Sequence, residues 1–170
     1  MKKAIIFLLA MTLLINYAVS QQKDPNPGFA EFNRRFSKNF KYPFQLEDRC
    51  ISTVTLMMVT FRSDGSVDSI EFSDSVLDQF KDEFFKVKDK IDFKSVFYDI
   101  ININKKNKVV VIPIFIESEK TGPLGCESNI IASDLKNLYN FSGKPISGNY
   151  YLYSSLYIIN VKTYHFSNSE

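Results

Sequence analysis

The sequence has few of the residues that most catalytic and metal sites need. It contains one histidine, His165, and two cysteines, Cys50 and Cys126. A zinc site needs three or four His, Cys or carboxylate ligands at a recognisable spacing, and the chain offers no such set. A glycine-rich phosphate loop and a Gly-x-Ser-x-Gly elbow are also missing. We therefore expect no enzyme activity, no catalytic residues, no metal and no other cofactor.

One enzymatic alternative stays open. Cys126 or Cys50 would act as a nucleophile with His165 as its base, in a small cysteine-dependent hydrolase or redox protein. No local motif around these residues supports that arrangement. The alternative requires a free thiol, so a disulfide between the two cysteines would remove its nucleophile.

Residues 21–170 carry no net charge. The chain has 21 basic and 19 acidic residues, and two of the lysines lie in residues 1–20, which leaves 19 of each sign. A neutral domain with scattered lysines has no general electrostatic reason to bind nucleic acid or an anionic membrane. We expect neither as a partner.

The N-terminus has the pattern of a secretory signal. Lys2 and Lys3 precede an apolar run over 4–15, and Ala18 and Ser20 place small residues where a signal peptidase reads them. The apolar run is too short to span a bilayer comfortably. We expect a signal peptide over 1–20, cleaved after Ser20, and a periplasmic or secreted protein. An uncleaved anchor is the alternative.

Export favours a disulfide between Cys50 and Cys126, because a bridge persists in an oxidising compartment. Cys50 comes just before one predicted strand, and Cys126 follows another that ends near Ile116. If these strands are antiparallel neighbours, both cysteines reach the same end of the sheet. Two buried free thiols are the alternative.

The clearest local structure is a hairpin around Asp64 and Gly65. The run over 51–62 is rich in β-branched residues, and a second strand-like run follows over 67–73. Glycine takes the positive φ that a hairpin turn demands, and aspartate tolerates it. Apolar residues occupy both alternating faces of the first run, so we expect both faces to be covered.

Two helices are predicted from apolar residues at spacings of three and four. The first has a stripe of four phenylalanines, and it should begin at Asn26-Pro27 and end by Tyr42-Pro43. The second follows the hairpin, with Ser75 as its N-cap. The apolar stripes are Phe29, Phe32, Phe36 and Phe40 in the first helix, and Leu77, Phe80, Phe84 and Ile91 in the second.

The rest of the chain predicts further strands. Residues 100–103 suggest an extra edge strand, and 109–116 form a β run in which Pro113 must lie at an edge, at a bulge, or with its nitrogen facing away from a partner. Beyond 119, we expect a loop over 121–125, a short helix over 130–139 and a turn over 142–145. Residues 150–164 indicate one long strand or a hairpin.

This order of elements resembles the C-terminal domain of the TonB family. The shared features are Tyr42-Pro43, a strand, the run 64–73 beginning Asp-Gly-Ser-Val, an amphipathic helix, and the strand over 109–115 with its proline and phenylalanine. The resemblance covers about residues 42–117. It implies an α+β fold in which an antiparallel sheet carries the helix on one face.

The resemblance also implies a function. It points to a periplasmic or envelope protein-binding or assembly module that meets another envelope protein, with strand addition at a sheet edge as the suggested mode. A complete energy transducer is not expected, because the stretch over 21–40 reaches only about 70 Å when fully extended. The expected organisation is a signal peptide over 1–20, a leader and short helix over 21–41, a TonB-like domain over 42–119, and an extension over 120–170 packed on that domain.

Overall fold

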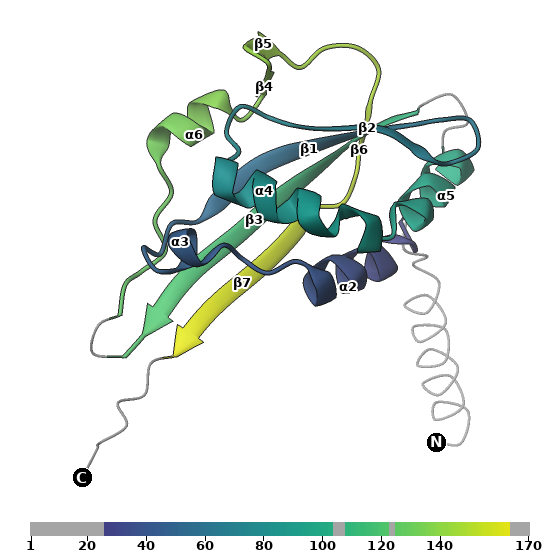
Figure 1. The fold of residues 1–170 in the computed structure, drawn as a ribbon. Helices are drawn as coiled ribbons and strands as arrows, with labels where there is room; N and C mark the ends of the chain where they lie inside the picture. Colours follow the sequence, from purple (N-terminus) through teal and green to yellow (C-terminus); the bar gives the residue numbers. More distant parts are fainter. Residues whose placement is uncertain (1–25, 104–107, 123–124, 164–170) are drawn as a thin grey trace, which may run out of the picture.

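The computed structural model describes residues 26–103, 108–122 and 125–163 and has the predicted α+β class (Figure 1). The expected signal peptide over 1–20 and His165 lie outside the described residues. The helices are α2 (Phe29–Asn39), α3 (Phe44–Glu47), α4 (Asp78–Val87), the 3-10 helix η1 (Lys88–Lys90), α5 (Phe93–Ile103) and α6 (Ala132–Asn137). The strands are β1 (Thr53–Phe61), β2 (Val67–Phe72), β3 (Val109–Thr121), β4 (Asn140–Phe141), β5 (Lys144–Pro145), β6 (Tyr151–Leu152) and β7 (Leu156–Thr163).

The main sheet is mixed, in the order β2-β1-β3, with β6 and β7 following one another along the far side of β3. β1 pairs antiparallel with both β2 and β3, as expected. β6 and β7 pair parallel with β3, so the run over 150–164 is one interrupted strand and not a hairpin. The C-terminal extension thus joins the sheet that β1, β2 and β3 form.

The hairpin lies where the sequence predicts it. Gly65 has φ 85°, and the Asp64 carboxylate accepts hydrogen bonds from the Ser66 amide at 2.9 Å and its hydroxyl at 2.7 Å. These bonds lower the pKa of Asp64. A Cβ atom on Gly65 would lie 2.5 Å from the Phe97 ring. The turn therefore needs glycine both for its φ and for its close approach to α5.

Pro113 lies inside the sheet, opposite Leu56 of β1. The Leu56 amide and carbonyl are both bonded to Ser73, at 3.0 and 2.9 Å, and so face away from β3. By the alternation of an antiparallel pair, the Pro113 nitrogen also faces away from β1. It points to the side of β3 where 153–155 connect β6 to β7. The missing N–H of proline therefore costs the β1–β3 ladder nothing.

One face of the sheet carries the helices α2, α3, α4 and α5 and the main core. Phe80 and Phe84 of α4 are fully buried, as the periodicity predicts, and both rings pack edge-on against Phe72 of β2. The predicted N-cap is wrong. Ser75 lies before the helix, with its buried hydroxyl on Ser73 at 2.8 Å, and Leu77 is the N-cap.

The expected edge strand over 100–103 is wrong, because this segment belongs to α5. Phe93, Val96, Phe97 and Ile100 are all buried at spacings of three and four. The helical spacing of these buried residues outweighs the β propensity of the isoleucines.

The predicted start of α2 is also wrong. The helix begins at Phe29 with Gly28 as its N-cap, and the Gly28 amide donates to the Asp99 carboxylate of α5 at 2.8 and 3.0 Å. The Asn26 side chain donates to Ser154 at 2.9 Å instead of capping the helix. A carboxylate distant in sequence replaces the local cap. The helix ends at Asn39, before Tyr42-Pro43, and α3 follows.

A smaller cluster covers part of the opposite face of the sheet. Leu56 and Val111 pack there with Phe141 of β4 and with Leu138, which follows α6. The predicted short helix and turn are confirmed as α6 and the β4–β5 hairpin. We call this opposite side the outer face and the helix-covered side the inner face.

Candidate functional site

The outermost strand on one side of the sheet is β7. It pairs with β3 over eight positions, from Ile114 opposite Leu156 to Thr121 opposite Thr163. Among the described residues no strand pairs with its other side. A row of backbone amide and carbonyl groups therefore faces outward, as on any sheet edge.

The outer face of β7 is apolar and exposed. Tyr157, Ile159 and Val161 alternate along it and are 54%, 55% and 50% exposed. They stand beside Phe115, Glu117 and Glu119 of β3. A hydrogen bond with the Glu117 carboxylate raises the pKa of Tyr157. The result is an apolar strip next to open backbone.

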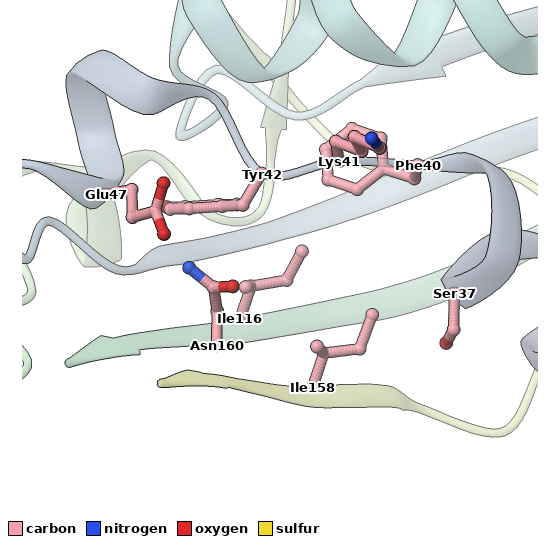
Figure 2. Close-up of a pocket in the computed structure, with 8 residues that line it drawn as sticks. All are labelled: Ser37, Phe40, Lys41, Tyr42, Glu47, Ile116, Ile158 and Asn160. Carbon is pink, nitrogen blue, oxygen red and sulfur yellow. The ribbon is translucent and has the colours of Figure 1, made fainter. Parts of the chain in front are cut away.

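A cavity of about 370 Å³ lies on the inner face of the same strand (Figure 2). Ile158 and Asn160 of β7 and Ile116 of β3 line one side. The other side comes from the end of α2, the segment after it and α3, through Ser37, Phe40, Lys41, Tyr42 and Glu47. β7 thus carries the apolar strip on one face and a wall of this cavity on the other.

Tyr42 is a fixed part of the cavity wall. Its hydroxyl donates to the Ile51 carbonyl at 2.7 Å, so the Thr53 hydroxyl, also at 2.7 Å, donates to Tyr42. Burial raises the pKa of Tyr42 to about 12, and the hydrogen bond from Thr53 offsets only part of this. The phenol stays neutral at physiological pH and ties the segment before α3 to β1.

Glu47 supplies a carboxylate to the cavity. Its Oε2 lies 3.4 Å from Lys162 Nζ, and that ammonium also lies 4.8 Å from the centre of the Phe44 ring. The Glu47 side chain is 19% exposed. The carboxylate is therefore held in place by α3 on one side and β7 on the other.

Two buried polar atoms on the inner face of β7 and β3 have no hydrogen-bond partner among the described residues. They are Asn160 Nδ2 and Ser118 Oγ, and the two residues are register partners on β7 and β3. Figure 2 shows the Asn160 nitrogen on the side of the cavity where Glu47 and Tyr42 lie. Of the two residues, Asn160 lines the cavity. A buried donor without a partner costs about 1–3 kcal/mol, so the Asn160 amide is suited to a ligand that accepts its hydrogen bond.

The two predicted disulfide residues are brought together. Cys50 and Cys126 form a bridge, with Cα atoms 6.0 Å apart. The antiparallel pairing of β1 and β3 that the prediction assumed is present. Near the bridge, Lys120 Nζ contacts Asp48 Oδ1 at 2.6 Å and lowers the pKa of that carboxyl. The bridge ties the extension to the start of β1.

The remaining sequence expectations concern thiol chemistry, metal ions and membrane spans, and they can be compared with the described residues. In the bridge, neither Cys50 nor Cys126 is a thiolate, and their suggested partner His165 lies outside the described residues. Among the residues described, no three His, Cys, Asp or Glu side chains are grouped to hold a metal ion. None of the described helices has the length and apolar character to cross a membrane.

Sequence reasoning missed most residues of this site. It singled out Tyr42 only as part of Tyr-Pro, and it did not select Glu47, Ile158 or Asn160. A signal was present in the run over 156–163, where Asn160 and Lys162 alternate with Tyr157, Ile159 and Val161. That alternation indicates a strand with two different faces, but not which element lies beneath either of them.

Comparisons with family models, with curated proteins and with solved structures found no match for this chain.

Proposed function

We propose that this chain is an exported, non-enzymatic module that binds another envelope protein by accepting a strand along β7. The observation that carries the proposal is the open edge of this eight-residue strand together with its exposed apolar strip. Strand addition uses main-chain hydrogen bonds for affinity and side-chain pockets for specificity. β7 offers both, since the cavity lies beneath it.

The resemblance to the TonB C-terminal domain supports the same proposal. The resembling segment forms the β2-β1-β3 sheet with α4 on its inner face. In this chain, β6 and β7 occupy the side of β3 that would otherwise be open. The edge available to a partner is therefore β7, at the end of the C-terminal extension.

Export with cleavage after Ser20 belongs to the proposal. The Cys50–Cys126 bridge supports it, because such bridges persist in oxidising compartments. Intact-mass measurement on protein recovered from outside the cytoplasm should give a chain that begins at Gln21. Retention of residues 1–20 on that protein would contradict cleavage.

The binding proposal is tested with lysine substitutions on β7 and, as a control, on β2 at the opposite edge of the sheet. Ile159→Lys puts a lysine in the apolar strip, and edge lysines block strand pairing. The exported form and this variant are used as baits on envelope extract. We expect the wild type to capture a protein that Ile159→Lys captures at least about tenfold less, since tenfold corresponds to only about 1.4 kcal/mol.

The matched control is Ser69→Lys, which makes the same change of charge on β2 at the opposite edge. It should capture the same protein as the wild type. Equal capture by Ile159→Lys, or loss only with Ser69→Lys, would contradict binding at β7. Both variants should keep the thermal unfolding midpoint of the wild type, because neither side chain is buried.

A further inference from the structure

The cavity lies where a strand added to β7 would place a side chain. Ile158 and Asn160 face the inner side of β7 and line the cavity. Neighbouring strands lie about 4.8 Å apart, and their side chains alternate between the two faces of the sheet. Every second side chain of an added strand would therefore lie on the helix side of the sheet, and those in register with 158 and 160 would stand beside these two residues.

The cavity walls select the chemistry of that side chain. Phe40, Ile116 and Ile158 provide apolar surface. Asn160 Nδ2 is a buried donor without a partner among the described residues, and Glu47 provides a carboxylate that accepts hydrogen bonds. The site thus suits a group with an apolar body and a tip that both accepts and donates.

Charged side chains do not meet these conditions. A carboxylate would stand against that of Glu47, and an ammonium would stand near Lys41 at the cavity wall and Lys162, which is 3.4 Å from Glu47. A phenol is neutral, accepts from the Asn160 amide and donates to Glu47. Its ring fits apolar walls, and the hydroxyl of a buried tyrosine usually finds a partner.

We propose that this cavity binds a phenolic side chain, a tyrosine carried by the strand that adds to β7. The inference rests on the strand addition proposed above. At about 370 Å³ the cavity is near the small end of ligand sites, which suits one aromatic side chain. Tyrosine anchors of this kind commonly dominate the energy of protein interfaces.

The test uses small probes of one shape, so that it does not depend on the partner. p-Cresol, toluene and p-toluate are titrated separately into the exported form, and NMR follows the Ile116 and Ile158 methyl groups and the Asn160 side-chain amide. We expect p-cresol to shift these signals with an affinity at least about tenfold higher than toluene, because a site that hydrogen-bonds a hydroxyl rejects the analogue without it. p-Toluate should not bind.

Two variants separate this inference from the proposed function. Asn160→Leu keeps the side-chain size and removes the donor, so p-cresol should lose its advantage over toluene at the isoleucine methyl groups. Ile159→Lys lies on the outer face and should bind p-cresol as the wild type does, although it loses strand addition. Strand addition is read by protein capture and the cavity by the probes, so either can fail alone.

Several results would overturn the inference. They are equal binding of p-cresol and toluene, no signal shift at the solubility limit of p-cresol, binding of p-toluate at least as tight as that of p-cresol, and an unchanged p-cresol preference in Asn160→Leu. Preference for p-cresol that disappears in Asn160→Leu and persists in Ile159→Lys supports it.

Discussion

The two edges of the sheet are built in opposite ways. β2 has six residues, exposed acids at Asp68 and Glu71, and a register shift opposite it between Thr60 and Phe61. β7 has eight residues with Tyr157, Ile159 and Val161 exposed along its outer face. Charges, irregularity and short length are the means by which proteins protect sheet edges from pairing. β2 has charges and an irregularity and is the shorter of the two strands, whereas β7 has a continuous register with β3 and Lys162 as its one charged residue.

The difference extends to what lies beneath each edge. Phe72 of β2 is buried against Phe80 and Phe84, so α4 closes the inner face there. Under β7, Ile158 and Asn160 line a cavity. One edge is packed as part of the core, while the other keeps both open backbone and open space. This contrast is why we assign binding to β7.

The largest effect is expected where α4 supports the β2 edge. Phe84 is fully buried, and Phe84→Ala should lower the free energy of unfolding by about 3–5 kcal/mol through the cavity it leaves. Phe85 is the matched control, because it is the next phenylalanine and is 38% exposed. Phe85→Ala should cost clearly less in urea unfolding. A loss below about 1 kcal/mol for Phe84→Ala would contradict the packed β2 edge.

The disulfide gives the next effect. It closes a loop of 77 residues, counting both cysteines across a separation of 76, and the chain-entropy model gives at most about 4.5 kcal/mol for that length. Replacing both cysteines by alanine should lower stability by about 2–4.5 kcal/mol. Denaturant unfolding measures it, and the wild type under reducing conditions should behave like the double variant. No change on reduction would show that the bridge does not hold the extension to β1.

A smaller effect is expected at the cavity under β7. Tyr42→Phe removes the hydroxyl that bonds to Ile51 and Thr53, and should cost about 1–2 kcal/mol in the free energy of unfolding. Tyr139→Phe is the control, because that residue is 63% exposed, and it should be neutral. If Tyr42→Phe and Tyr139→Phe change the free energy of unfolding by the same amount, the Tyr42 hydroxyl does not stabilise the cavity wall.

The smallest effect lies on α2 and depends on pH. Hydrogen bonds from Arg34 and Arg35 lower the pKa of Glu31 from 4.5 to about 2. Because the folded-state pKa is depressed, this contribution is complete above pH 4.5 and is lost as the pH falls through 2. The stability difference between wild type and Glu31→Gln should therefore shrink from pH 5 to pH 2. High salt at pH 7 should also reduce it, because the ion pairs are exposed.

The sequence predicts the β2 half of the molecule better than the β7 half. Asp64-Gly65 and the phenylalanine spacing of α4 are local signals, and each has one physical solution. The parallel pairing of β7 with β3 depends on contacts between residues far apart in the chain, for which periodicity gives no sign. The same holds for the α2 cap, because Asp99 reaches Gly28 from another helix.

The candidate site was harder to predict than the fold. Glu47, Tyr42 and Asn160 come from three separate segments, and only their packing makes a cavity. The cysteine pair was predictable, because it needs only two neighbouring strands and an oxidising compartment. The α5 segment shows the opposite failure. Its isoleucines favour a strand locally, and the helical spacing of Phe93, Val96 and Ile100 overrides them.

The most direct test of the account is amide hydrogen exchange on the module with and without its captured partner, compared at the two edges. In a strand, only every second residue directs its amide to a given side. We therefore predict that alternate amides over 156–163 exchange more slowly in the complex, while those over 67–72 keep their rates. Slowed exchange along β2 with no change along β7 would contradict the assignment of the binding edge.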